Sequence, residues 1–260
     1  AHRDRKLFVS TEGSHLEFDL LAGQGDCTAT ALHEGRFASR GFNTPHLRKG
    51  YELIEEADLL REASRVAAQA IEKVKAPAVD AGQYDLVLDP EHLSLTIHES
   101  CGHPSELDRA LGYEANYAGT SFLTPEKLGN FRYGSQHVNL VADNTESETL
   151  AATGYDDDGV QCQQWDVVRN GVFVGYCTNR EVASKIGESR SRGSNRADGW
   201  SHVPMVRIAN IGLEPGSATV DQLIADVKHG IYIEGHGSYS IDQRRYNFQF
   251  GGDAFWLIEN

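Results

Sequence analysis

The sequence of 260 residues has no long apolar run, no excess of basic residues and few cysteines. No stretch approaches the roughly 18 apolar residues of a membrane span, and the N-terminal AHRDRK lacks the apolar centre of a signal peptide. We therefore expect a cytoplasmic protein that is not a membrane protein. The net charge of −14 disfavours direct binding of nucleic acid, which usually needs a basic surface.

The cysteines are too few and too scattered for the disulfide framework of a small secreted domain. They are Cys27, Cys101, Cys162 and Cys177. Asn170-Gly171 predicts a two-residue hairpin turn. Pairing outward from this turn places Cys162 and Cys177 diagonally, at about 7–8 Å, which is too far for a relaxed disulfide. We expect reduced thiols.

The first third of the chain is predicted to be strands followed by one helix. Residues 6–42 contain four strand-like runs separated by glycine-containing turns, and they indicate an antiparallel meander. A helix of about 25 residues should follow and end before Pro77. Its apolar residues recur at helical spacing: Leu59, Ala63, Val66, Ala67, Ala70, Ile71 and Val74.

After a linker at 76–83, the pattern indicates a fold rich in strands. YDLVLD is strand-like, and Asp89-Pro90 is a typical helix start, with a capping aspartate and a proline in the first turn. Residues 120–178 should be mostly strands. A capping box at Thr219–Gln222 should begin a helix that Gly230 ends, and the last 26 residues read as further strands. We predict an α+β fold rich in antiparallel sheet.

HESCGH, residues 98–103, resembles the zinc-protease pattern H-E-x-x-H, but its second histidine comes one residue late. On a regular α-helix, His98 and His103 would point about 140° apart and could not hold one ion. A π-bulge would bring residues five apart onto one face, and Gly102 would ease the distortion. We therefore predict irregular hydrogen bonding from Ser100 to His103. The alternative is a chance cluster without metal.

The stretches LVLDPEHLSLTIHESCGHPSELD and NYAGTSF resemble the TldD/PmbA family of metalloproteases, first described as modulators of DNA gyrase. PMVRIANIGLEPG, VKHGIYIEG and FWLIEN follow in the family's order. The chain is similar to TldD-like members, which carry H-E-x-x-x-H, whereas PmbA-like (TldE) members lack it. The resemblance implies that residues 1–76 end an N-terminal α/β domain and that 77–260 form a β-rich metalloprotease domain, apparently truncated at its C-terminus.

The resemblance also implies the roles of the motif residues. His98 and His103 would be zinc ligands, and Glu99 would be the general base that takes a proton from the attacking water. The family's third ligand is a cysteine beyond the strand that matches FWLIEN, so it would lie beyond Asn260. Cys101 lies inside the motif, but we expect it to be a small buried side chain rather than a ligand.

Several other features can be interpreted either as functional or as purely structural. The segment 185–202 could be a lid that meets substrate through Arg190, Arg192 or Arg196, but its composition favours a solvated loop. His202 could be a site histidine, but a lone histidine is more often a surface or satisfied residue. Tyr232 and Trp256 are expected to be core or sheet-face aromatics.

These observations favour a zinc peptidase that hydrolyses peptides or unfolded segments. The resemblance implies a homodimer or a heterodimer with a PmbA-like (TldE) subunit, and a substrate laid along an exposed strand edge. The alternatives are a non-catalytic subunit or scaffold, and a modulator of DNA gyrase that acts by binding. Because both ends of the sequence look cut, we expect further chain on either side.

Overall fold

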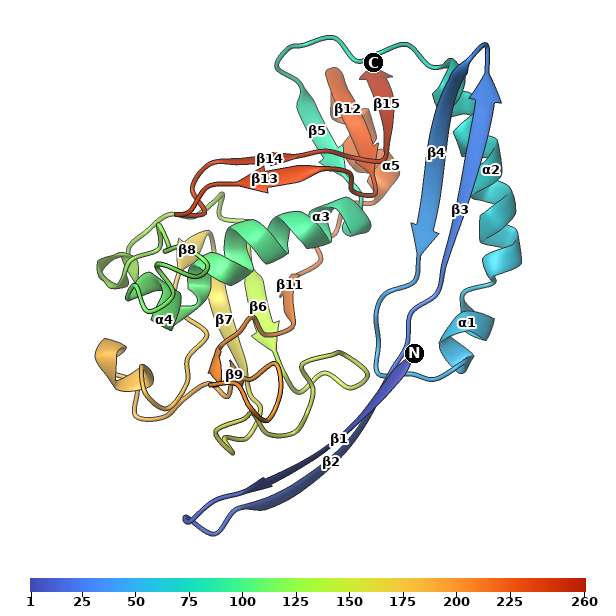
Figure 1. Ribbon diagram of the computed structural model, residues 1–260. Coiled ribbons are helices and arrows are strands. Elements are labelled where there is room, and N and C mark those ends of the chain that lie inside the picture. The colour runs from blue at the N-terminus through green and yellow to red at the C-terminus, as the bar shows by residue number, and fades with distance from the viewer.

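The computed structural model describes residues 1–260 and begins with two separate β-hairpins (Figure 1). The first contains β1 (His2–Val9) and β2 (His15–Ala22), and the second contains β3 (Asp26–His33) and β4 (Arg36–Asn43). The predicted strands are present, but the predicted meander is wrong because β2 and β3 do not pair. Gly23 exchanges backbone hydrogen bonds of 2.9 and 3.1 Å with Leu47, so the link between the hairpins pairs elsewhere.

Two helices replace the single helix of about 25 residues that the sequence predicted. They are α1 (Glu52–Glu56) and α2 (Leu59–Lys75). Asp58 separates them at a φ of 45°, a left-handed conformation that a regular right-handed helix does not contain. Its side chain then caps α2 by accepting a hydrogen bond from the Arg61 amide. Val66, Ala70 and Val74 are buried along the face of α2 that packs on β3 and β4, which confirms the centre of the predicted apolar stripe, whereas Ile71 is 50% exposed.

The rest of the chain forms two larger sheets, two short ribbons and several short helices. The strands are β5 (Asp85–Leu88), β6 (Leu140–Asp143), β7 (Gln164–Arg169), β8 (Val172–Phe173), β9 (Asn195–Arg196), β10 (Met205–Val206), β11 (Ile211–Leu213), β12 (His229–Glu234), β13 (Tyr239–Ile241), β14 (Phe248–Phe250) and β15 (Ala254–Glu259). The α-helices are α3 (Pro90–Ile97), α4 (Leu107–Ala110) and α5 (Val220–Ala225). A π-helix spans His98–Gly102, and 3-10 turns span His103–Ser105, Pro125–Lys127 and Ala183–Ile186.

The two sheets lie at opposite ends of α3 (Figure 1). One has the order β15-β12-β5, with β12 antiparallel to β15 and parallel to β5. The other has the order β11-β6-β7-β8 and is antiparallel throughout. Two-stranded ribbons pair β9 with β10 and β13 with β14. The architecture is α+β and rich in antiparallel sheet, as predicted.

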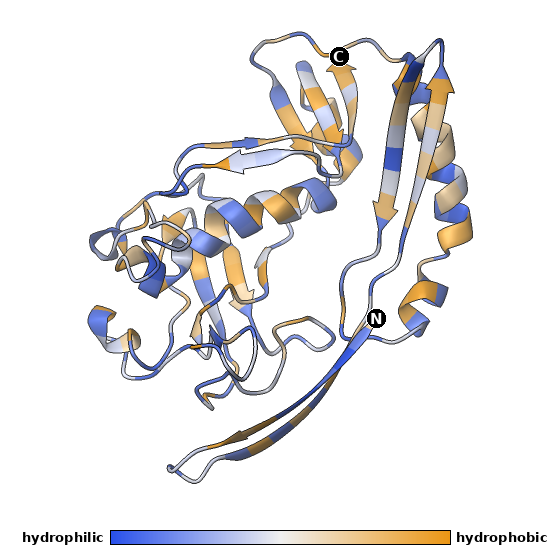
Figure 2. Ribbon diagram, viewed as in Figure 1, coloured by the Kyte–Doolittle hydropathy of each residue, from blue (hydrophilic) through white to orange (hydrophobic).

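The main hydrophobic core lies between the four-stranded sheet and the segment that continues α3. Its 16 buried residues include Ile97 at the end of α3, Cys101 from the segment that follows, Leu107 from α4, and Phe173 and Tyr176 after the β7–β8 turn. Figure 2 shows the apolar residues gathered on β6 and β7. Because a large apolar side chain contributes about 1.5–3 kcal/mol when fully buried, this core anchors the chain around HESCGH firmly.

Residues 120–178 contain fewer strands than predicted. The Asn170-Gly171 turn is confirmed: Val168 pairs with Phe173 across it, and both turn residues have positive φ. However, β8 ends at Phe173, so the hairpin does not extend to the cysteines. All four cysteines are unpaired thiols. The irregular segments are held by backbone hydrogen bonds such as that from Gly129 to Phe173.

The capping box at the start of α5 is confirmed. The Thr219 side chain accepts from the Gln222 amide, and the Gln222 side chain accepts from the Thr219 amide. The predicted end at Gly230 is wrong, because α5 stops at Ala225. Gly230 lies in β12 instead, where an added Cβ would come within 2.4 Å of the Asp85 carbonyl oxygen. A close approach of strands, not a helix end, requires this glycine.

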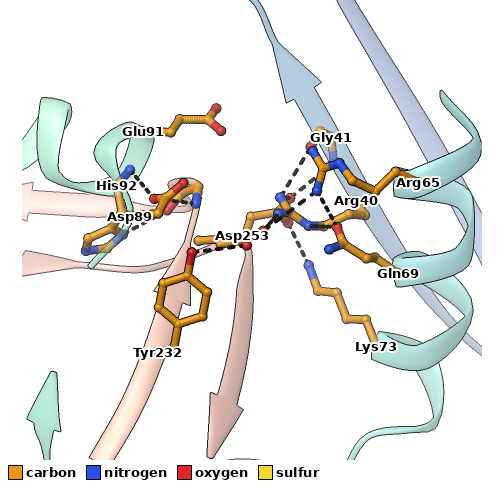
Figure 3. A network of polar contacts seen from close by, with 12 residues as sticks. Arg40, Gly41, Arg65, Gln69, Lys73, Asp89, Glu91, His92, Tyr232 and Asp253 are labelled. Carbon is orange, nitrogen blue, oxygen red and sulfur yellow. Dashed lines mark hydrogen bonds and ion pairs between the residues drawn. The ribbon is translucent and has the colours of Figure 1, made fainter. Parts of the chain in front are cut away.

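A network of charged side chains joins the second hairpin, β3–β4, and helix α2 to the three-stranded sheet (Figure 3). Arg40 on β4 is only 3% exposed and donates to Asp253, 2.7 Å away, and to Glu234 on β12. Lys73 on α2 donates to the other Asp253 oxygen at 2.7 Å. Burial by itself raises the pKa of Asp253, but hydrogen bonds from Lys73 and Arg40 outweigh it and lower the pKa. Asp253 therefore carries its charge at neutral pH and links three elements.

The Tyr232 and Trp256 rings lie on paired strands with centroids 5.6 Å apart, in line with their predicted place on a sheet face. No helix of the structure is both long enough and apolar enough to cross a membrane.

Candidate metal centre

The HESCGH segment continues α3 but changes its winding. Asp89 caps α3 by accepting from the His92 amide at 2.7 Å, and Pro90 occupies the first turn. At His98 the α-helix becomes a π-helix, and the His103 amide donates to the carbonyl of His98, five residues back. The predicted irregular hydrogen bonding is confirmed. Gly102 is required by packing, because an added Cβ would lie 2.9 Å from two carbons of Ile208.

The π-turn brings the two histidines onto one side of the segment. The His98 and His103 rings meet edge to face with centroids 4.8 Å apart. One nitrogen from each ring and one carboxylate oxygen of Glu99 all lie within 4.8 Å of one another. The chain therefore assembles two imidazoles and a carboxylate from six consecutive residues, and the divergence expected on a regular helix does not occur.

His103 is oriented by a buried glutamate. Its Nδ1 lies 2.9 Å from Oε2 of Glu106, whose side chain is fully buried. Because an ionised carboxylate can only accept, Nδ1 is the nitrogen that donates to Glu106, and in the neutral form of the ring Nε2 then carries the lone pair. Metal-binding histidines usually have such a second partner, which fixes the ring and the tautomer.

Glu106 itself belongs to a buried ionic network. The Arg109 Nε donates to the same Oε2 at 2.8 Å, and Arg109 is 1% exposed. Arg109 and Arg207 both contact Glu114 at 3.3 Å. Burial tends to raise the pKa of Glu106, but the hydrogen bond and charge of His103 and those of Arg109 outweigh it and lower the pKa. The carboxylate is therefore ionised and able to hold His103.

His98 is suited to bind metal as a neutral imidazole. The ring is exposed at the surface, yet the protein atoms beside it lower its pKa by partial desolvation, and the charge that His103 carries when protonated lowers the pKa further. A metal ligand must be deprotonated, so a lowered pKa favours binding at neutral pH.

Glu99 has one hydrogen-bonding partner. It is 8% exposed, and its Oε2 accepts from Nη1 of Arg245, which lies 146 residues further along the chain. Arg245 stands at the corner of the β13–β14 hairpin, which passes alongside α3 (Figure 1). The other oxygen, Oε1, makes no hydrogen bond with the protein.

The remaining sequence candidates lie outside the cluster. The Cys101 thiol contacts the Tyr133 hydroxyl at 3.0 Å, and burial raises its pKa to about 11, so it is a core thiol and a poor ligand. Arg192 pairs with Glu188, whereas Arg190 and Arg196 are exposed. His202 is exposed, as expected.

Sequence reasoning missed Glu106 and Arg245. Glu106 follows His103 by three residues, and this spacing places two side chains together on a helical turn, so it could have been found. Arg245 carries no local signal, because only the tertiary fold brings it to Glu99.

The donor set fits a zinc ion. Two imidazole nitrogens are ligands that zinc accepts, His103 already has its outer partner in Glu106, and a carboxylate of Glu99 lies beside both rings. A cavity of about 620 Å³ lies elsewhere, against β6 and β11, and includes no residue of the motif. The cluster is therefore identified by its chemistry and not by a deep pocket.

Comparison with known protein families gives the class. Residues 81–260 match the PmbA/TldA metallopeptidase C-terminal domain. The fold and the His–Glu–His cluster thus agree with a metallopeptidase-type protein. The chain belongs to the TldD/PmbA family.

Curated relatives support this assignment. A metalloprotease of Methanocaldococcus jannaschii is 29% identical over 98% of this chain and 54% of its own length. A metalloprotease TldD homolog of Haemophilus influenzae is 30% identical over 76% of this chain and 39% of its own length, and a zinc metalloprotease TldD homolog of Saccharolobus solfataricus is 26% identical over 88% and 47%. The chain spans about half the length of the curated relatives it matches.

Solved structures share the fold. A Thermotoga maritima protein named as a candidate modulator of a DNA gyrase superposes with a TM-score of 0.78 at 22% identity, covering 98% of this chain and 55% of the other. TldE from Thermococcus kodakarensis gives a TM-score of 0.72 at 19% identity, covering 96% and 53%. At these identities the likeness concerns the fold alone.

Proposed function

We propose that this chain carries two zinc ligands and the general base of a peptidase that acts on peptides or unfolded segments. The observation that carries the proposal is the π-turn, which gathers ligand atoms of His98, Glu99 and His103 within 4.8 Å. Zinc is supported by the donor set and by the relative named as a zinc metalloprotease. The family's cysteine, beyond Asn260, would be the third ligand.

Zinc bound by these residues would lower the pKa of water and polarise the peptide carbonyl. Glu99 then has the base role: its carboxylate takes one proton from water as the water oxygen bonds to the carbonyl carbon. When the carbon–nitrogen bond breaks, Glu99 returns that proton to the leaving amine. The products are one carboxylic acid and one amine, and Glu99 ends as it began.

Glu106 and Arg109 contribute indirectly, because Glu106 orients His103 and Arg109 holds Glu106. By accepting from Nδ1 of His103, Glu106 fixes the ring and leaves Nε2 as the nitrogen that would bind the metal. Arg109 and Arg207 balance the buried negative charge. Without that balance, an ionised carboxylate with no exposed surface would be costly.

We further propose a dimer with a second copy or with a TldE-type subunit, supported by the similarity to a TldE structure. The alternative of a non-catalytic scaffold is less well supported, because a scaffold needs neither an assembled His–Glu–His cluster nor an oriented imidazole. The division at residue 76 and the cytoplasmic location stay predictions.

The test is a peptidase assay on the full-length protein with an unfolded substrate such as casein. We expect hydrolysis that a zinc chelator abolishes and added zinc restores. Glu99→Gln should remove hydrolysis, since an amide cannot accept the proton, yet leave zinc bound. His202→Gln, which changes an exposed histidine outside the cluster, is the matched control. Activity retained in Glu99→Gln would remove Glu99 from the base role.

A further inference from the structure

The corner of the β13–β14 hairpin has a strained and tightly organised backbone. Arg245 has a φ of 62°, a left-handed conformation that side chains other than glycine seldom adopt. Asp242 fixes the corner by accepting from the amides of Arg244 and Tyr246 at 3.1 and 2.9 Å and from the Asn247 side chain at 2.7 Å. Such strain persists only where the surroundings impose it, often at functional sites.

The same hairpin is attached to the segment that follows α4. The amides of Thr120 and Phe122 donate to the carbonyls of Gln243 and Arg244 at 2.7 and 2.9 Å. Gly119 makes this approach possible, because a Cβ there would lie 2.2 Å from the Gln243 carbonyl oxygen. Hydrogen bonds within the turn and hydrogen bonds from Thr120 and Phe122 therefore both fix the turn, and they restrict the backbone of Arg245.

The Arg245 side chain reaches one target. Nη1 donates to Oε2 of Glu99, and this is the only hydrogen bond that the side chain makes. Its Nε is buried and has no hydrogen-bond acceptor, although buried donors in proteins usually have one. The position of the guanidinium therefore does not satisfy all of its own N–H groups. The left-handed backbone of Arg245 and the unsatisfied Nε both raise the free energy of the folded protein. Together they place the Arg245 guanidinium against the Glu99 carboxylate.

We propose that Arg245 is a positioning residue for the general base. The inference rests on the proposed function, because it gives a role to a residue that acts through Glu99. By holding Oε2, Arg245 fixes the plane of the carboxylate. Oε1 is then the oxygen that takes the proton from water and later returns it to the amine.

The test compares Arg245→Met with Arg244→Met in the full-length, zinc-loaded protein. Arg244 is the adjacent arginine, and its exposed side chain makes no hydrogen bond or ion pair, so it is a matched control. We expect Arg245→Met to lower kcat by about 10- to 100-fold, in the range that misplaced catalytic groups produce. KM and zinc content should stay close to those of the wild type. Arg245→Lys should recover part of kcat.

Chemical rescue separates positioning from a merely structural effect. Methylguanidinium added to Arg245→Ala should restore activity at least several-fold, whereas it should not affect Glu99→Gln. A rise in KM with kcat unchanged would overturn the inference, because it would make Arg245 a substrate-binding residue. Wild-type activity in Arg245→Met, with Glu99→Gln inactive, would overturn the inference and leave the proposed function standing. Absence of chelator-sensitive hydrolysis in the wild type would overturn both.

A second readout does not depend on activity. In the metal-free protein, the shift in unfolding midpoint caused by Arg245→Met should be clearly smaller in the Glu99→Gln background than in the wild type, because the partner is already lost. Equal shifts in the two backgrounds would show that the residues do not interact, and would overturn the inference.

Discussion

The amide of His103 donates to the carbonyl of His98 and not to that of Glu99. This change of hydrogen-bond partner brings the His98 and His103 rings together. An i→i+5 bond inserts one residue into the turn, so residues five apart share a face. A pattern that looks one residue too long for H-E-x-x-H therefore reaches a similar arrangement of two imidazoles. The wider backbone turn of the π-helix accommodates the extra residue.

The first prediction concerns the glycine beside His103. Gly102→Ala should lower the free energy of unfolding by about 1–3 kcal/mol, because the new methyl group would overlap Ile208 in a packed core. It should also weaken zinc binding, since relief of the overlap would move His103. Denaturant unfolding and a competitive zinc titration measure the two effects.

Gly216→Ala is the control for this prediction, because nothing lies within 4 Å of the added Cβ. The double variant Gly102→Ala, Ile208→Val should recover part of the loss by removing one of the overlapping carbons. A Gly102→Ala protein as stable as the control would show that the π-turn tolerates a side chain.

The second prediction concerns the outer partner of His103. Glu106→Gln should weaken zinc binding by about 10- to 100-fold, the usual effect of losing such a partner. The fully buried Arg109 would lose the closer of its two carboxylate partners and keep only Glu114, so the free energy of unfolding should also fall, by up to about 3–5 kcal/mol. Zinc affinity should be measured under conditions where the variant is folded by circular dichroism.

Glu114→Gln separates the two effects, because Glu114 contacts Arg109 and Arg207 but not His103. It should destabilise the protein and leave the zinc affinity nearly unchanged. Equal zinc affinities in wild type and Glu106→Gln would contradict the assigned role of Glu106.

Local signals in the sequence predicted local structure well. Asp89-Pro90, Asn170-Gly171 and Thr219–Gln222 each act through neighbouring residues, and each forms the expected cap or turn. The π-turn could be predicted because the motif and the helix geometry conflicted within six residues. The family resemblance added the roles of the motif residues, which residue patterns alone left open.

Long-range structure could not be predicted in the same way. The two hairpins are separate because Gly23 pairs with Leu47, and the long helix breaks at Asp58 although its apolar stripe continues. Arg245 meets Glu99 only after the β13–β14 hairpin lies beside α3. Such contacts depend on how elements pack, and no spacing in the sequence encodes them.

The third prediction concerns the charged network of Figure 3. The pKa of Asp253 is lowered, so its stabilising effect is complete above its unfolded pKa of about 3.9 and is lost as the pH falls through the lower folded value. Asp253→Asn should therefore reduce the free energy of unfolding by about 1.5–3 kcal/mol at pH 7. The difference from the wild type should shrink as the pH falls below about 4.

Denaturant unfolding from pH 2.5 to 7 measures this effect, with Asp198→Asn, an exposed aspartate without a partner, as the control. A difference that does not change with pH would mean that Arg40 and Lys73 do not stabilise the ionised form of Asp253.

The last prediction concerns the third zinc ligand. His98 and His103 offer two ring nitrogens, whereas catalytic zinc normally has three protein ligands, and a thiolate is a strong contributor to zinc affinity. We expect residues 1–260 alone to bind zinc at least about 100-fold more weakly than a chain extended through the family's cysteine, given the roughly 10–16 kcal/mol of complete structural sites. Metal analysis after dialysis should find one zinc per extended chain, and substitution of the added cysteine by serine should return the affinity to that of residues 1–260. Tight one-to-one binding by residues 1–260 would mean that these residues supply another ligand. Glu99 would then be the first residue to substitute, because its carboxylate already lies within 4.8 Å of both imidazoles, whereas the Cys101 thiol lies against Tyr133.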